Sequence, residues 1–88
     1  MKIKKNFILQ EVANEYLVVP IAEEADRLNG IIRLNETGAF LWNCLETGVN
    51  DTIEIEELLL QKYDIEQNRA HKDVSSFVER LSFLGCLE

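Results

Sequence analysis

The first third of the chain contains two short apolar runs, separated by polar residues, that predict a β-hairpin. Residues 7–12 and 16–19 are rich in β-branched and aromatic side chains, which favour strands. Asn14, between them, tolerates the dihedral angles of a tight turn. Pro20 has no backbone N–H, so the second strand is expected to end there or to leave its next residues unpaired.

A loop and a third strand are predicted to follow the hairpin. Residues 23–29 are polar and lead through Gly30 into a short apolar stretch. That stretch consists of Ile31, Ile32, Arg33 and Leu34. If the three strands meander in order, the third strand lies at the edge of the sheet with its outer side unpaired.

After residue 34 the apolar spacing changes from 2 to 3.6 residues, which indicates helices. Asn35 suits the N-cap of a first helix, and Gly48 is placed to end it. A second helix is predicted to open at Asp51 or Thr52. The apolar stripes are Gly38, Leu41, Trp42 and Leu45 in the first helix and Ile55, Leu58, Leu59 and Tyr63 in the second.

A third helix is predicted from about residue 68 to residue 84, with Gly85 as its stop. Its stripe is Ala70, Val74, Phe77, Val78, Leu81 and Leu84. Three strands followed by three helices indicate the α+β class, because strands and helices stand in separate blocks. At 88 residues, the sequence predicts a single domain over residues 1–88, with one modest core.

The composition is that of a globular protein, with 47% hydrophobic and 28% charged residues. No apolar run approaches the roughly 18 residues that span a bilayer. Lysines occur among the first residues, but Gln10 and Glu11 interrupt any apolar segment of a secretory signal. The protein is therefore expected in the cytoplasm.

The formal charge of −7 disfavours DNA, RNA and anionic membranes as partners. Nucleic-acid binders neutralise phosphates with a basic face. Here the only basic cluster is Lys2, Lys4 and Lys5, and residues 46–66 hold seven acids against one lysine.

Side chains that carry chemistry are sparse. Cys44 and Cys86 lie 42 residues apart without a CxxC pair, and His71 is the one histidine, so no zinc site is predicted. Both thiols are expected to be buried or half-buried. No nucleophile–base spacing surrounds His71, so neither catalysis nor a cofactor is predicted. The acids Glu54, Glu56 and Glu57 are interpreted as partners of a helix dipole and solvated charges rather than as metal ligands.

Two blocks of the sequence resemble the coenzyme PQQ synthesis protein D family. The first block is residues 30–39 followed by Leu41-Trp42, similar to the family's "Leu-Asn-x-Thr-Gly/Ala-Ala" junction. The second block contains Leu58-Leu59, Tyr63-Asp64, Asp73-Val74, Phe77-Val78, Leu81, Leu84-Gly85 and Leu87-Glu88. Together the blocks give a resemblance over almost the whole chain, from about Phe7 to Glu88.

The resemblance implies a winged-helix-like recognition element for ribosomally synthesised and post-translationally modified peptides. Such a peptide chaperone binds the leader segment of a precursor peptide and presents the core segment to a modifying enzyme. In the PQQ pathway that enzyme is a radical S-adenosylmethionine (SAM) protein. The family's leader adds as a strand to the third strand and lies in a groove against the third helix.

The resemblance also implies which residues bind the peptide. Ile31, Ile32, Arg33 and Leu34 match the third strand and would supply backbone hydrogen bonds. Asp73, Phe77 and Arg80 match the groove side of the third helix. Phe77 is open to two interpretations, core residue or floor of the groove, and the two overlap. Asp73 and Arg80 would fix polar ends of the peptide.

One departure from the family pattern is the loop over residues 21–29, which is longer and more acidic than the family's wing. Its acids either select a basic leader or keep the loop solvated. A peptide other than the PQQ precursor is therefore expected. Two other classes stay open: a winged-helix DNA-binding regulator, which the charge disfavours, and a small acidic subunit or inhibitor whose second helix docks on a basic protein.

Overall fold

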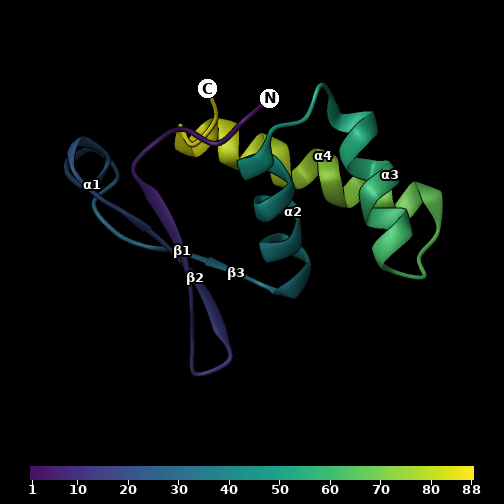
Figure 1. Ribbon diagram of the computed structural model, residues 1–88, viewed down its shortest axis with the longest axis horizontal. Helices are drawn as coiled ribbons and strands as arrows, with labels where there is room; N and C mark the ends of the chain where they lie inside the picture. The colour runs from purple at the N-terminus through teal and green to yellow at the C-terminus, as the bar shows by residue number, and fades with distance from the viewer.

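Seven elements of secondary structure follow one another along the chain. The computed structural model describes residues 1–88. The elements are β1 (Phe7–Val12), β2 (Glu15–Pro20), α1 (Glu23–Leu28), β3 (Ile32–Leu34), α2 (Glu36–Thr47), α3 (Thr52–Lys62) and α4 (Gln67–Leu84). Figure 1 shows the hairpin of β1 and β2 projecting to one side of the helices α2, α3 and α4.

The three strands form an antiparallel sheet in the order β1-β2-β3. Ala13 and Asn14 join β1 to β2 with φ angles of 52° and 65°, both positive, as a two-residue hairpin turn requires. Pro20 is the last residue of β2, as predicted. The predicted meander is thus confirmed, and β3 lies at an edge of the sheet.

The prediction of a loop over residues 23–29 was wrong, because a short helix, α1, lies there. The element order is therefore β-β-α-β-α-α-α within the confirmed α+β class. The helix has only six residues, and its N-cap residue, Ala22, makes no side-chain capping bond, so neither periodicity nor a cap marks it in the sequence. Arg27 holds it in place by donating to Glu24 at 2.6 Å and to the carbonyl oxygen of Gly85 at 3.2 Å.

The predicted helix ends are confirmed. The Asn35 side chain accepts from the backbone N–H of Gly38 at 2.7 Å and caps α2, and Asp51 caps α3. Gly85 ends α4 in the left-handed conformation, with φ of 73°. These caps satisfy backbone groups that the helices leave unpaired.

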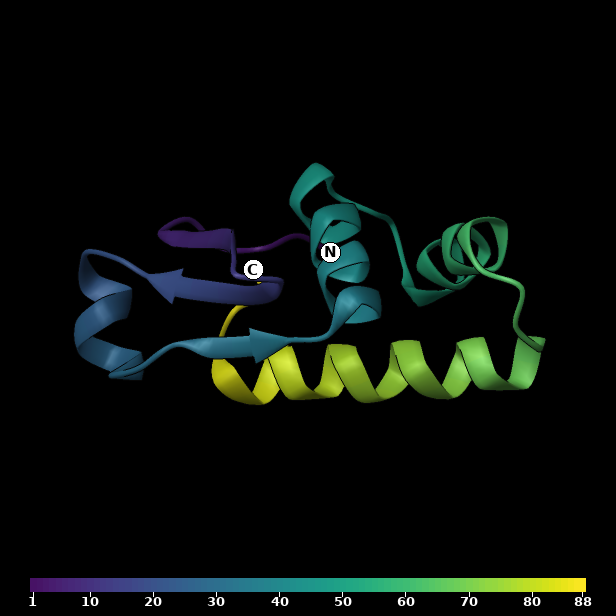
Figure 2. The same cartoon turned by 90° about the horizontal axis from the view of Figure 1, so that it is seen from below.

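The apolar stripes meet in one core between the sheet and the helices. Its fully buried side chains include Val18, Trp42, Leu45, Leu59 and Leu81. Figure 2 shows α4 running along β3 at one end and beneath α2 and α3 at the other. As predicted, Cys86 is buried and Cys44 half-buried, and burial raises the pKa of both thiols.

The two ends of the chain lie side by side (Figure 1). Ile3 and Leu87 form an isolated antiparallel bridge, and the N–H of Lys4 donates to the carbonyl oxygen of Cys86 at 2.8 Å. None of the helices has both the length and the apolar character needed to cross a membrane.

Candidate functional site

The free side of β3 presents the backbone of Arg33. All three residues of β3 lie opposite residues of β2, but the carbonyl oxygen of Arg33 accepts a hydrogen bond of 3.4 Å from Nη2 of Arg80, a residue of α4. In an antiparallel strand the N–H and C=O of one residue point to the same side, and successive residues alternate. We therefore infer that Arg33 directs both groups outward, whereas Ile32 and Leu34 bond to β2.

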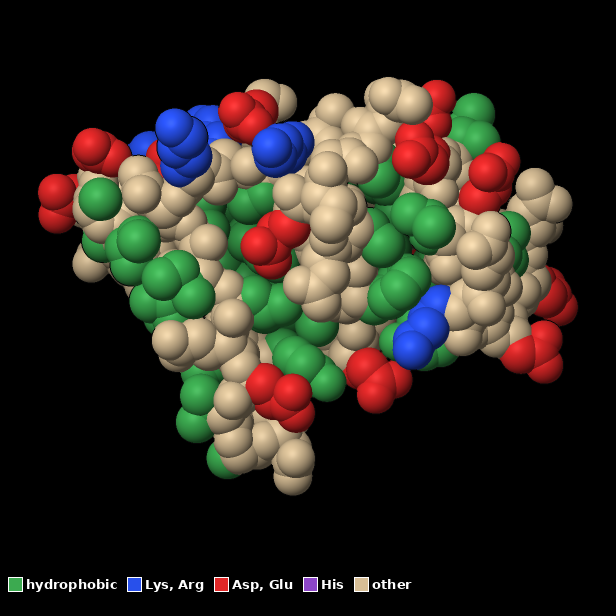
Figure 3. Space-filling view, viewed as in Figure 1, with side chains coloured by type: hydrophobic (Ala, Val, Ile, Leu, Met, Phe, Trp, Pro, Cys, Tyr) green, Lys and Arg blue, Asp and Glu red, His purple; other side chains and the backbone are tan.

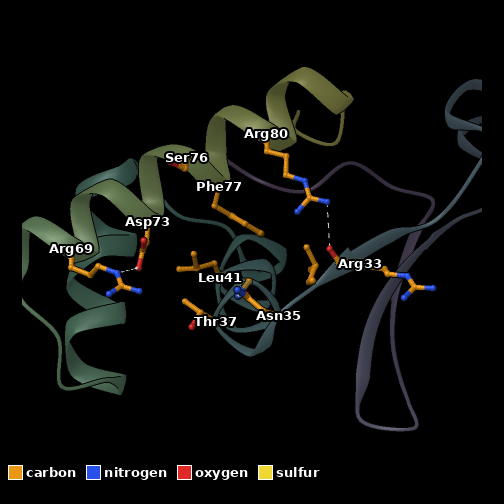
Figure 4. A pocket seen from close by; sticks show the side chains of 11 residues that line it. Arg33, Asn35, Thr37, Leu41, Arg69, Asp73, Ser76, Phe77 and Arg80 are labelled. Carbon is orange, nitrogen blue, oxygen red and sulfur yellow. Dashed lines mark hydrogen bonds and ion pairs between the residues drawn. The ribbon is translucent and has the colours of Figure 1, made fainter.

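The side chains of β3 alternate as well, in the perpendicular direction. Ile32 and Leu34 point into the core, with exposed fractions of 5% and 8%. The Arg33 side chain is exposed and points away from the helices, as Figure 4 shows. The strand thus offers its backbone at the free edge while its apolar side chains anchor it to the core.

A groove of about 460 Å³ lies between β3, α2 and α4 (Figure 4). From α4 it is lined by Arg69, Asp73, Ser76, Phe77 and Arg80, from α2 by Thr37, Gly38 and Leu41, and from β3 and its end by Arg33, Leu34 and Asn35. A second hollow, of about 410 Å³, continues past Arg80 and is lined by Ile31, Ile32, Phe83 and Leu84, among others. Arg80 lines both, so together they follow β3 from one end to the other.

The structure brings most of the seven predicted site residues together in this groove. Arg33, Leu34, Asp73, Phe77 and Arg80 all line it. Ile32 and Ile31 line the adjoining hollow instead; the Ile31 side chain is 51% exposed and lies just before β3 rather than within it.

Phe77 belongs to both the core and the groove. Its ring is only 9% exposed and packs within the core cluster, yet one side of it lines the groove. Figure 4 shows the ring pointing from α4 toward Leu41 and Asn35. The two interpretations of Phe77 from the sequence therefore describe the two sides of one ring.

Gly38 keeps the groove floor low, and sequence reasoning missed its place in the site. A Cβ atom there would lie 3.4 Å from both Phe77 Cε1 and Leu34 Cβ, and 3.1 Å from Asn35 Oδ1. Glycine inside a helix costs about 1 kcal/mol relative to alanine, so its place in α2 was itself a signal of close packing.

Arg69 also lines the groove and was not predicted from the sequence. It precedes Asp73 by four residues on the same flank of α4, so extending that flank by one turn would have found it. It donates to Asp73 at 3.2 Å. Arg33 forms a second ion pair, with Glu15 at 3.3 Å. Three of the four arginines of the chain thus line one groove, and Arg80 alone among them forms no ion pair with a carboxylate.

Acidic side chains outnumber basic ones in the chain as a whole, by 16 to 9. In Figure 3 red side chains are spread over the face and its rim, while most of the blue ones gather near the chain ends. Among the acids of α1, Glu23 accepts from Asn6 at 3.0 Å and Glu24 from Arg27, and neither lines the groove or the adjoining hollow. Their bonds are internal, which favours a structural role for these two acids.

The groups considered for chemistry in the sequence lie apart from the groove. His71 contacts Glu56 at 3.0 Å between α4 and α3, on the exposed surface. No three side chains of His, Cys, Asp or Glu gather closely enough to hold a metal ion.

The fold and the groove define a class of small α+β domain that leaves one sheet edge open beside a helix-lined groove. Within this class, the sequence profile of coenzyme PQQ synthesis protein D (PqqD) matches residues 15–87, and the chain belongs to this family. The family resemblance inferred from the sequence is thus confirmed.

Two solved structures share the fold. One is described as TbiB1 in complex with the TbiA(beta) leader peptide, with a TM-score of 0.78, 20% identity, and coverage of 100% of this chain and 95% of that one. The other is a lasso peptide synthetase B1 complexed with the leader peptide, with a TM-score of 0.73, 18% identity, and coverage of 97% and 93%. No curated protein matches the sequence.

Proposed function

We propose that this protein binds the leader segment of a ribosomally made precursor peptide, which adds as a strand to the free edge of β3. The observation that carries the proposal is the outward backbone of Arg33 beside a groove between β3 and α4. Both solved structures that share the fold hold a leader peptide. Strand addition uses backbone hydrogen bonds for affinity and side-chain pockets for selection.

The proposed role is that of a cytoplasmic adaptor without catalysis of its own. By holding the leader, it raises the effective concentration of the core peptide beside a modifying enzyme. We propose a radical SAM protein as that enzyme, as the resemblance to the family implies. We propose that the leader belongs to a peptide other than the PQQ precursor, because the segment over residues 21–29, which contains α1, is longer and more acidic than the wing that the family resemblance implies.

Amide hydrogen exchange tests this binding mode at single residues. The probe is the synthetic leader segment of a candidate precursor peptide, added to ¹⁵N-labelled protein. In the free protein the Arg33 amide is expected to exchange fast, and those of Ile32 and Leu34 slowly, because only the latter bond to β2. Leader binding should protect Arg33 and leave the other two unchanged.

Two results would oppose the proposal. Saturating leader that leaves the Arg33 amide unprotected rules out strand addition at β3. Perturbations confined to the acidic helix α3 would instead indicate the docking subunit considered from the sequence. A salt titration adds a check, because affinity for nucleic acid falls steeply with salt, whereas backbone strand pairing does not.

A further inference from the structure

Arg80 holds the position that an added strand must take. In the free protein its guanidinium donates to the outward carbonyl oxygen of Arg33. A peptide that pairs with β3 places a backbone N–H on this same oxygen. The oxygen has two lone pairs, so Arg80 either shares it with the peptide or leaves it. In both cases a peptide that covers Arg80 leaves most of its five N–H donors without an acceptor, which is costly for a cation.

The protein itself offers Arg80 no such partner. The other two groove arginines are held by Asp73 and Glu15, and no carboxylate of the chain lies within ion-pair distance of Arg80. The peptide is therefore the source of the missing anion. A carboxylate is the fitting group, because its two oxygens match the fork of a guanidinium.

The alternation of side chains along a strand fixes where that carboxylate stands. The peptide residue opposite Arg33 points its side chain to the outer face, as Arg33 does, and its two neighbours point toward α4. The neighbour opposite Leu34 lies over the floor that Leu34 shares with Phe77. The neighbour opposite Ile32 lies at the hollow that Ile32 shares with Arg80.

We propose that the leader carries an acidic residue two positions after an apolar one, an inference that rests on the proposed function. The apolar side chain sits on Phe77, and the Asp or Glu carboxylate binds Arg80. This order holds for a peptide antiparallel to β3, which continues the wholly antiparallel sheet. The chain thus selects an acidic leader despite its own charge of −7.

A peptide selection tests the pattern without knowledge of the natural leader. The probe is a random nonapeptide library displayed on mRNA; about six extended residues cover the roughly 21 Å from Arg69 to Phe83 along α4. Selection on wild-type protein should enrich Asp or Glu two residues after an apolar residue. Selection on R80E should replace the acid by Lys or Arg at the same position.

Matched variants then measure the contact. The strongest selected peptide and its version with Asn or Gln for the acid are titrated against wild type, R80Q and K72Q. Lys72 is exposed on α4 outside both hollows, so K72Q makes the same charge change without touching the site. R80Q should weaken binding of the acidic peptide about tenfold at low salt, K72Q less than about twofold, and the amide peptide should bind R80Q and wild type alike.

Several outcomes would overturn this inference. They are selection on wild type without acidic enrichment, acidic enrichment that persists on R80E, or equal losses of affinity for R80Q and K72Q. If those occur while selected peptides still protect the Arg33 amide, the acid preference is wrong and strand addition stands. If no selected peptide protects that amide, the proposed function itself has failed.

Discussion

Proline substitution along β3 distinguishes the residue whose backbone N–H points to the proposed peptide from the residues whose N–H groups bond to β2. Arg33→Pro removes an N–H that points outward, so no bond of the sheet is lost and edge strands tolerate proline. Its side-chain ion pair with Glu15 is exposed and contributes little. We expect the variant to melt close to wild type.

The loss of affinity follows from one hydrogen bond. A net bond is worth about 0.5–1.5 kcal/mol, so Arg33→Pro should weaken leader binding about 2- to 13-fold. Arg33→Ala is the control, because it removes the same side chain and keeps the N–H.

Leu34→Pro should behave in the opposite way. It removes an N–H bonded to β2 together with a side chain that is only 8% exposed. Losing a buried leucine alone costs about 2–5 kcal/mol, against a total of about 4–13 kcal/mol for a chain of this size. Ile32→Pro should fall in the same class.

Thermal melting and leader titration of the four variants decide the matter. The inferred outward direction of the Arg33 N–H is wrong if Arg33→Pro unfolds the protein while Leu34→Pro leaves its melting temperature near that of wild type. A folded Arg33→Pro that binds the leader as tightly as Arg33→Ala would refute strand addition at this edge.

Three further predictions concern the groove floor and the core. Gly38→Ala should leave the melting temperature within a few degrees of wild type, because the higher helix propensity of alanine, about 1 kcal/mol, offsets the tight contacts of its Cβ atom. The added methyl group should weaken leader binding because it raises the floor of the groove. Unchanged affinity would contradict the close fit. Phe77→Ala should lose about 3–5 kcal/mol in denaturant unfolding, and its control Leu81→Ala about 2–5 kcal/mol. Only Phe77→Ala should lower the affinity of the protein that remains folded, and equal affinities would make Phe77 a core residue alone. Burial raises the pKa of the Cys86 thiol in the folded state. This thiol should therefore leave the free energy of unfolding unaffected below the ordinary thiol pKa and should lower it as pH rises above that value. Urea unfolding at several pH values checks this, and Cys86→Ala should show a smaller fall.

The helices could be predicted from the sequence because their signals are local. Asn35 and Asp51 are caps, Gly85 is a stop, and apolar residues recur at helical spacing between them. α1 escaped prediction for the same reason, because its stability comes from a contact distant in sequence. Arg27 reaches the carbonyl oxygen of Gly85, 58 residues away, and no local pattern encodes that bond.

The site could be predicted in part. Asp73, Phe77 and Arg80 share one flank of α4, a relation that helical spacing contains. Which backbone groups of β3 face outward depends on the pairing of Ile32 and Leu34 with β2, and register is a property of two strands together. The ion pair between Arg33 and Glu15 likewise needs the hairpin in place.

The short length of β3 determines where the selectivity of this protein must reside. With three residues in the strand, only Arg33 directs its N–H and C=O outward, and two such bonds supply about 1–3 kcal/mol. Micromolar binding requires about 8 kcal/mol, so most of the affinity must come from side chains of the peptide in the groove. In the proposed complex those side chains would meet Phe77, Arg80 and Asp73 of α4, beside Leu34 of β3, which all line the groove. Exchanging the groove flank of α4 between family members should therefore exchange leader preference, whereas removing the Arg33 N–H with proline should lower affinity for all leaders alike.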